Sequence, residues 1–345
     1  MVVDARGGGL MARRGWRELD ESDVRVRPGR RGSRPRSKRR PDHADAEEAM
    51  VVAVDRGRWT CALDGDPKRL VVAMRARELG RTPVVVGDLV GLVGDTSGKP
   101  DTLARIVRVS DRGSVLRRTA DDTDPYERIV VANAEQLIIV CSLADPPPRP
   151  GFIDRCLVAA YAGGLTPVLC LTKSDLASPD EWIEAYSSLE LPVIVTRMDA
   201  EPTELRDRLE QRVSALVGHS GVGKSTLVNR LVPDADRATG EVSGVGKGRH
   251  TSTSAVALPL PGEGWVVDTP GIRSFGLAHV TPDDVIAVFE GFAEAAEECP
   301  PNCGHLGGSD DPDCHLDDFA EGSGNKEQLA SLRRLLRSRA GLDES

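Results

Sequence analysis

Short apolar runs rich in valine, separated by turn residues, fill the chain between Met50 and Val109. Runs of this kind, bounded by Gly, Pro and Asp, are typical of β-strands. Five of them in succession predict a small β-barrel, and the OB-fold is the barrel class that fits best. The basic segment Arg112–Arg118 is predicted to connect this barrel to the next domain. The predicted strands are Met50–Val54, Trp59–Leu63, Val71–Met74, Asp88–Val93 and Leu103–Val109.

After Ala134 the pattern changes, because strand-like apolar runs alternate with segments of helical periodicity. This alternation predicts an α/β domain with a mostly parallel sheet that helices cover on both faces. The turn Pro261–Gly264 joins the last two strands as a hairpin, so one antiparallel strand is expected. The predicted strands are Gln136–Leu143, Pro167–Thr172, Pro192–Thr196, Ala215–Gly218, Ala255–Leu260 and Trp265–Asp268. The predicted helices are Phe152–Ala162, Pro179–Leu189, Thr203–Val213 and Lys224–Leu231.

The C-terminal part is predicted to be helical. One helix begins after Thr281, a capping residue followed by Pro, and runs to about Glu298. A second helix spans Asn325–Arg339, with leucines at helical spacing and arginines on the remaining surface. This last helix is either a packing helix with a solvated polar face or a basic face for ribosomal RNA.

These patterns divide the chain into a basic arm at 1–48, the barrel at 49–112, the α/β domain at 113–276 and the helical module at 277–345. The net charge of −9 conceals an asymmetry, because residues 1–41 carry 13 basic and five acidic residues. Such a Gly-, Pro- and Ser-rich basic segment buries too little apolar surface to fold, so we expect a disordered arm. The arm either contacts RNA phosphates or serves as a solubilising tail.

Seven cysteines, an odd number, do not indicate a disulfide framework. No segment approaches the roughly 20 apolar residues that cross a bilayer, and the N-terminus lacks the apolar core of a signal peptide. We therefore expect a cytoplasmic protein without a membrane partner. Four of the cysteines lie in apolar runs and are expected to be buried: Cys61, Cys141, Cys156 and Cys170.

Residues Gly218–Ser225 read G-H-S-G-V-G-K-S and match the phosphate loop G-x-x-x-x-G-K-[ST]. The context supports the match, since the apolar run Ala215–Val217 precedes the loop and a helical segment follows it. Lys224 should reach the β- and γ-phosphates of a nucleotide, and Ser225 should bind Mg²⁺ through its hydroxyl.

Two further elements predict a guanine nucleotide. Asp268–Gly271 has the D-x-x-G form, which brings an Asp to Mg²⁺ and a glycine N–H to the γ-phosphate. Thr172–Asp175 resembles the guanine-reading [NT]-K-x-D element, where Asp175 accepts from the N1–H and N2–H₂ groups of the base and so favours GTP over ATP. Thr196 lies in the segment that normally contacts the base O6. Thr172 stands where Asn is more usual, which removes an amide that ties this element to the phosphate loop.

The order of these elements is inverted relative to ordinary GTPases, because Asp175 lies 43 residues before Gly218. We therefore predict a circularly permuted GTPase domain. Its switch segment after Gly271 leads into the C-terminal module, which makes that module a candidate lever arm. The expected nucleotide-binding residues are Thr172, Lys173, Ser174, Asp175, Thr196, Gly218, His219, Ser220, Gly221, Val222, Gly223, Lys224, Ser225, Thr226, Asp268 and Gly271.

The catalytic group is a separate question, because Ile272 follows Gly271 where Ras-like enzymes carry a water-orienting Gln. In the glycine-rich segment 240–254, His250 and Thr251 are the candidates, with Thr251 binding Mg²⁺ beside Ser225 and Asp268. His250 either positions the water, or is an exposed loop residue or a contact to an RNA phosphate.

Three thiols and an imidazole cluster near the C-terminus: Cys299, Cys303, His305 and Cys314. This set fits a closed tetrahedral Cys₃His site for one structural Zn²⁺. His315 is an alternative ligand to His305, although its adjacency to Cys314 makes ligation by both awkward.

The five-strand barrel, the permuted GTPase motifs with Gly248–Thr251 reading G-R-H-T, and the trailing Cys₃His cluster together resemble the RsgA family, also called YjeQ or YloQ. The resemblance covers roughly residues 50–340. It implies a GTP-hydrolysing enzyme that binds the small (30S) ribosomal subunit and its 16S rRNA late in assembly, is stimulated by it and leaves on hydrolysis. The basic arm, Thr172 and the long spacing from His305 to Cys314 depart from the family pattern.

Two alternatives remain. A permuted GTPase that acts on the large subunit would share the nucleotide motifs but should lack the barrel and the thiol cluster. An RNA-binding protein with little turnover would bind GTP for structure alone. We expect a monomer.

Overall fold

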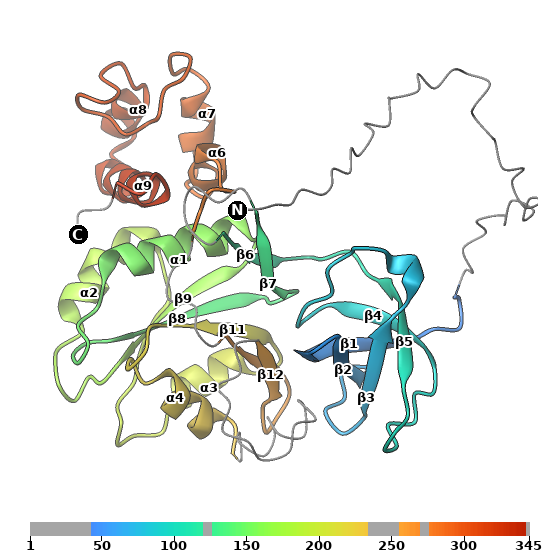
Figure 1. Ribbon diagram of the computed structural model, residues 1–345. Coiled ribbons are helices and arrows are strands. Elements are labelled where there is room, and N and C mark those ends of the chain that lie inside the picture. Colours follow the sequence, from blue (N-terminus) through green and yellow to red (C-terminus); the bar gives the residue numbers. More distant parts are fainter. Residues whose placement is uncertain (1–42, 120–125, 234–254, 270–275, 343–345) are drawn as a thin grey trace, which may run out of the picture. The chain divides into compact units, whose positions relative to one another are not determined.

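The first five strands close into a barrel in the computed structural model, which describes residues 43–119, 126–233, 255–269 and 276–342 (Figure 1). The strand order is β1-β2-β3-β5-β4, and β4 pairs back with β1 to complete the ring. The pairing of β3 with β5 is parallel and the other pairings are antiparallel. The predicted five-strand barrel is confirmed. The strands are β1 Glu47–Asp55, β2 Arg58–Leu63, β3 Leu70–Arg75, β4 Leu89–Gly94 and β5 Ala104–Val109, with a short 3₁₀ turn at Arg77–Leu79.

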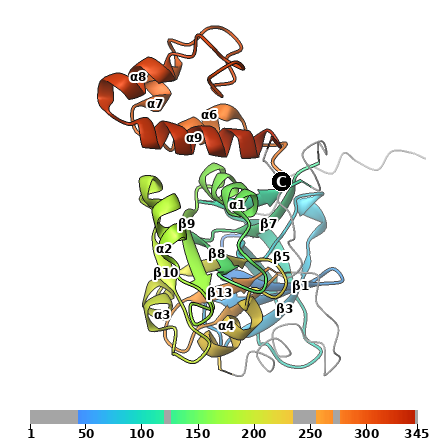
Figure 2. The same cartoon turned by 90° about the vertical axis from the view of Figure 1, so that its left-hand side faces the viewer.

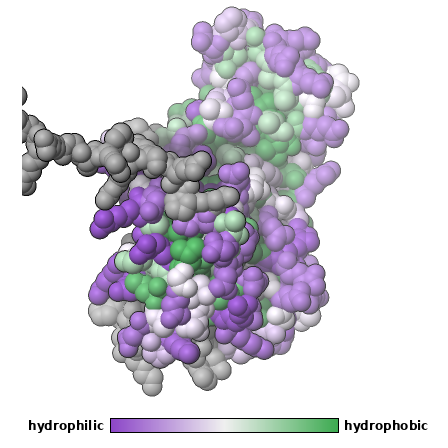
Figure 3. All heavy atoms as spheres, turned by 90° about the vertical axis from the view of Figure 1, so that its right-hand side faces the viewer, coloured by the Kyte–Doolittle hydropathy of each residue, from purple (hydrophilic) through white to green (hydrophobic). Residues whose placement is uncertain are grey.

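The barrel core is aliphatic. Val51, Cys61 and Ile106 are fully buried in it, and Trp59 packs against it from the side. The Trp59 indole N–H donates to the Val84 carbonyl at 3.0 Å, which fixes this partly buried ring in the barrel. Apolar side chains form small patches among polar ones on the face that Figure 3 shows.

The second part of the sheet is the α/β domain that the alternating pattern predicts. Its strand order is β10-β9-β8-β11-β13-β12, in which all neighbours are parallel except β12 and β13. Helices α1 and α2 cover one face, and α3 and α4 cover the other (Figure 1). The strands are β8 Gln136–Ser142, β9 Thr166–Thr172, β10 Val193–Val195, β11 Val213–Val217, β12 Val256–Pro259 and β13 Trp265–Asp268. The helices are α1 Pro150–Ala162, α2 Asp180–Ala185 with a 3₁₀ turn at Ser187–Leu189, α3 Thr203–Leu209 and α4 Lys224–Leu231.

The barrel and the α/β domain are joined at several points. Strand β12 pairs with β1 through Ala53 and Val256, so the two sheets are continuous. Gly87 lies so close to Ala132 that a Cβ atom there would be 1.9 Å from the Ala132 carbonyl oxygen. This close packing fixes the barrel on the edge of the α/β sheet.

The interpretation of Arg112–Arg118 as a simple connector is wrong. Val115–Arg118 forms strand β6, which pairs with β7, Arg128–Ala132, in a small antiparallel sheet. The guanidinium of Arg112 pairs with the fully buried carboxylate of Asp88, with Nε 2.6 Å from Oδ1. Arg112 therefore serves packing, which a run of like charges did not indicate, whereas Arg117 forms an exposed pair with Glu127.

The C-terminal module contains four helices among its described residues: α6 Pro282–Ile286, α7 Phe292–Ala296, α8 Leu316–Ser323 and α9 Lys326–Arg339. The prediction of one helix from Thr281 to Glu298 is wrong, although Thr281 caps α6 through a capping box with Asp284. Helix α6 already ends at Ile286, and α7 begins at Phe292. Gly291, just before α7, has a left-handed φ of +80°, and a Cβ there would be 2.7 Å from the Phe319 ring. Helix α8 was not predicted from the sequence.

Helix α9 packs on α1, and its polar contacts explain its arginines (Figure 2). Arg334 Nε lies 3.1 Å from the buried Asp154 carboxylate, and its guanidinium carbon lies 4.6 Å from the centre of the Tyr186 ring. Arg155 donates to the Ser338 carbonyl at 2.7 Å. The other arginines of α9 also have protein partners: Arg333 with Asp317, Arg337 with Asp310 and Arg339 with the Val280 carbonyl. Of the two interpretations of this helix, the structure favours the packing helix.

Among the residues that the structure describes, no helix is long and apolar enough to cross a membrane.

Replacing Arg334 by Ala should lower the free energy of unfolding by about 2 kcal/mol, because the buried Asp154 carboxylate loses this cation. Lys326→Ala is the matched control on the same helix, since its pair with Glu321 is exposed and should change stability by less than ~0.5 kcal/mol. Urea denaturation measures both variants. Equal losses would show that the pair between α9 and α1 adds no stability.

Candidate active site and metal centre

The phosphate loop lies between the end of β11 and the start of α4, as its sequence context predicts. Gly218 follows β11 so closely beside β8 that a Cβ atom there would be 2.6 Å from the Val140 carbonyl oxygen. Gly223 precedes α4 with a φ of +91°, a conformation that L side chains rarely adopt. Both glycines are therefore required by the path of the loop. Gly218, His219, Ser220, Gly221, Val222 and Gly223 form the loop, and Lys224, Ser225 and Thr226 form the first turn of α4.

Lys224 and the D-x-x-G aspartate meet beside this loop. Residue Asp268 ends β13, which pairs with β11 in the register Leu216 to Asp268. The Lys224 ammonium forms an ion pair with the Asp268 carboxylate, and both side chains are largely buried. Thr269, the next residue, donates its hydroxyl to the Leu216 carbonyl and fixes the chain after β13. The structure thus places a cation and a carboxylate together at the carboxyl end of two parallel strands.

The guanine-reading element is tied directly to the phosphate loop. The Thr172 hydroxyl donates to the Val222 carbonyl at 2.6 Å. Thr172 lacks the amide of the more usual Asn, as expected, but its hydroxyl supplies a donor that ties the element to the phosphate loop. Lys173 donates from its ammonium to the carbonyl of Asp145, in the segment after β8.

The remaining residues of this element lie against the segment after β10. Ser174 donates from its backbone N–H to the Thr196 carbonyl at 3.3 Å, and the Thr196 N–H donates to the Leu171 carbonyl at 2.8 Å. The exposed carboxylate of Asp175 accepts a bond of 3.5 Å from the Met198 N–H. The two segments that sequence analysis assigned to the base therefore adjoin each other. His250, Thr251 and Gly271 lie outside the described residues.

The groups behind the phosphate loop were not predicted from the sequence. Phe152 of α1 packs on the loop residue His219, with ring centres 4.1 Å apart. Burial lowers the pKa of His219, and the positive charge of nearby Arg149 lowers it further. The one sequence feature that could have pointed to this contact is the proline-rich segment Pro146–Pro150 after β8. Its prolines indicate a rigid turn before α1, but they do not show that Phe152 packs on the phosphate loop.

The four predicted zinc ligands converge in the C-terminal module. One potential ligand atom from each of Cys299, Cys303, His305 and Cys314 lies within 4.8 Å of all the others. Three thiols and one imidazole at such separations fit tetrahedral coordination of zinc by sulfur and nitrogen. His315 is not part of this cluster, since its Nε2 lies 3.1 Å from the Glu298 carboxylate.

The loop that carries the cluster is held by polar contacts around it. Asp311 accepts backbone N–H bonds from Gly304 at 2.9 Å and from Leu306 at 2.8 Å. Arg333 of α9 binds Asp317 with two bonds of 2.7 Å and contacts the His305 carbonyl at 3.4 Å. These contacts orient the ligand loop from outside, as is usual around metal ligands.

Comparisons with known proteins agree with the fold and its motifs. The family model described as RsgA GTPase matches residues 109–278. A protein of Gemmatimonas aurantiaca is 36% identical, and the match covers 84% of this chain and 98% of that protein. A protein of Chlorobaculum tepidum is 37% identical, over 76% of this chain and 87% of that protein. Both are named small ribosomal subunit biogenesis GTPase RsgA.

The chain belongs to the RsgA GTPase family. The crystal structure of YjeQ from Thermotoga maritima is similar to it, with a TM-score of 0.62, 26% sequence identity and coverage of 86% of this chain and 99% of that one. Like its RsgA relatives, this protein is a GTP-hydrolysing enzyme with an N-terminal barrel and a circularly permuted GTPase domain.

Replacing Thr172 by Ala in this RsgA-family enzyme should weaken GTP binding about tenfold, because the guanine element loses its bond to the phosphate loop. Thr172→Ser keeps the hydroxyl and should bind GTP like the parent protein. Titration with a fluorescent GTP analogue measures the dissociation constants. Equal affinity of the Ala variant would contradict the role assigned to this bond.

The seven cysteines should fall into two groups by their rate of reaction with a thiol reagent. Burial raises the pKa of Cys61, Cys141 and Cys170 to about 12 and that of Cys156 well above its ordinary value, so these thiols stay protonated and protected. Native protein loaded with zinc should react slowly with a thiol reagent, because the metal would hold the three cluster thiols. A chelator should make these three thiols react fast by releasing the loop that carries them, while the core thiols stay buried. Four fast thiols, or none, would argue against the Cys₃His assignment.

Proposed function

We propose that this protein binds the small (30S) ribosomal subunit late in its maturation, hydrolyses GTP in response to the subunit, and leaves after hydrolysis. The observation that carries the proposal is the match along 98% of a relative named for small ribosomal subunit biogenesis, which includes the barrel and the C-terminal module. Neither part is expected of a permuted GTPase that acts on the large subunit. A protein that acts on the ribosomal subunit would be cytoplasmic. We further propose that it acts as a monomer.

The ion pair of Lys224 and Asp268 supports binding of GTP with Mg²⁺ at this loop. Each group of the pair has a natural partner in the bound state, the ammonium on the β- and γ-phosphates and the carboxylate on the magnesium ion. Ser225, exposed in the first turn of α4, would supply its hydroxyl to the same ion. Asp175 would accept hydrogen bonds from guanine, because its carboxylate is exposed beside the Thr196 segment.

His250 remains the candidate for positioning water, and Thr251 and Gly271 the candidates for Mg²⁺ and the γ-phosphate. Each proposal rests on the motif alone. The structural Zn²⁺ would be held by the Cys₃His cluster, where four protein ligands leave no position for catalysis. Contacts to 16S rRNA would come from the barrel and the basic arm, and mostly to phosphates, since Trp59 is engaged in packing.

Hydrolysis assays with purified ribosomal subunits test this function. We expect 30S subunits to raise GTP turnover at least tenfold, and 50S subunits to have little effect. Lys224→Ala is the control, because a variant without the phosphate-binding ammonium should show no stimulated turnover. Stimulation by 50S alone would favour the large-subunit alternative. Absence of turnover with either particle would favour an RNA-binding protein that uses GTP for structure.

A further inference from the structure

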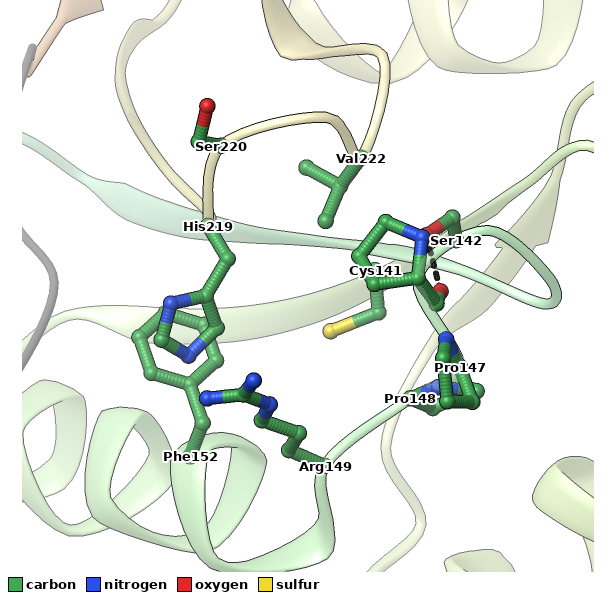
Figure 4. A pocket seen from close by; sticks show the side chains of 10 residues that line it. Cys141, Ser142, Pro147, Pro148, Arg149, Phe152, His219, Ser220 and Val222 are labelled. Atoms are coloured by element: carbon green, nitrogen blue, oxygen red, sulfur yellow. Dashed lines mark hydrogen bonds between the residues drawn. The ribbon is translucent and has the colours of Figure 1, made fainter.

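A pocket of about 380 Å³ lies behind the phosphate loop, between that loop, the end of β8 and the start of α1 (Figure 4). The ring pair of His219 and Phe152 forms one wall, and Pro147 and Pro148 lie opposite. The pocket shares His219, Ser220 and Val222 with the phosphate loop, but neither Lys224 nor Asp268 lines it, so it lies away from their ion pair. Its volume lies within the range of sites that bind small ligands or single groups of larger ones.

One cation faces this pocket without a counter-charge. Arg149 lines it, and its guanidinium forms no hydrogen bond or ion pair within the part of the chain that the structure describes. No carboxylate is among the lining residues. The site therefore suits a ligand that carries negative charge.

The aromatic wall suits a planar ligand. The His219 ring is tilted by 46° on Phe152, which is itself buried, so the imidazole is the ring available to an occupant. The flat face of this imidazole is the stacking surface, and burial and Arg149 lower the pKa of His219, which favours the neutral ring. Flat apolar surfaces from the prolines would face the other side of such a ligand.

We propose that this pocket receives one unpaired nucleotide of the RNA that the protein binds, with the base against His219 and a phosphate at Arg149. The inference rests on the proposed function, because a ribosomal subunit supplies the RNA. Proteins recognise single-stranded RNA by this combination, in which splayed bases stack on aromatic or histidine rings and cations hold the backbone. A planar base with an attached phosphate meets both requirements of the pocket.

A ligand in this pocket would contact the phosphate loop of the nucleotide site directly. His219 and Ser220 line the pocket and belong to the phosphate loop. A base held against His219 therefore restricts the loop from behind while GTP contacts it from the front. RNA binding and GTP binding become linked through the same loop, with no need for a contact between the two ligands.

Cross-linking tests the pocket directly. The full chain with a non-hydrolysable GTP analogue is irradiated with a mixed-sequence single-stranded RNA of about 12 nucleotides that contains 4-thiouridine. Mass spectrometry should find adducts on peptides that contain Phe152 or His219. Arg149→Glu should reduce these adducts at least fivefold and leave adducts on the barrel unchanged. Arg212→Glu is the matched control, since this exposed arginine precedes β11 at the end opposite the phosphate loop.

Salt dependence supplies a second measurement. Loss of one phosphate contact in Arg149→Ala should lower the slope of log affinity against log salt by about 0.7, and Arg212→Ala should leave it unchanged. Absence of adducts at the pocket, or equal slopes for both variants, would overturn the proposal. These readouts use free RNA, so they are independent of whether 30S subunits stimulate hydrolysis. A protein that cross-links at the pocket without subunit stimulation would contradict the proposed function and support the pocket.

Discussion

One hydrogen bond, from the Thr172 hydroxyl to the Val222 carbonyl, holds the two halves of the nucleotide site together. The chain reaches the guanine element first and returns to the phosphate loop only after α2, β10, α3 and β11. Parallel pairing of β11 with β8 and of β8 with β9 brings their carboxyl ends to one edge of the sheet. The bond then sets the distance between the two loops, so base recognition and phosphate binding depend on one buried contact.

Helix α1 connects this site to the C-terminal module. Phe152 in its first turn packs on the phosphate loop, whereas Asp154 and Arg155, on the following positions, bind α9. A lever arm was expected through the segment after Gly271, which lies outside the described residues. The contacts of α1 provide a second physical connection between the nucleotide site and the C-terminal module. A shift of the phosphate loop against Phe152 would also push on α1, which holds α9.

The strands and the site loops were predictable because their signals are local. Apolar runs bounded by turn residues located all five barrel strands, and motif spacing located the phosphate loop and the four clustered ligands. Contacts between distant segments were not predictable. Arg112 and Arg334 looked like solvated charges, yet their partners Asp88 and Asp154 are buried carboxylates far away in sequence. The close approach of Gly291, just before α7, to the Phe319 ring likewise joins segments that no local pattern connects.

The pairing of β12 with β1 also bears on the solubility of the enzyme. A strand at the margin of a sheet presents unpaired N–H and C=O groups that can recruit a strand from another molecule. The barrel occupies that margin on one side, and on the other side β10 is only three residues long. The N-terminal barrel thus covers one edge of the α/β sheet, so a GTPase domain without it would expose an edge strand that can pair with other molecules.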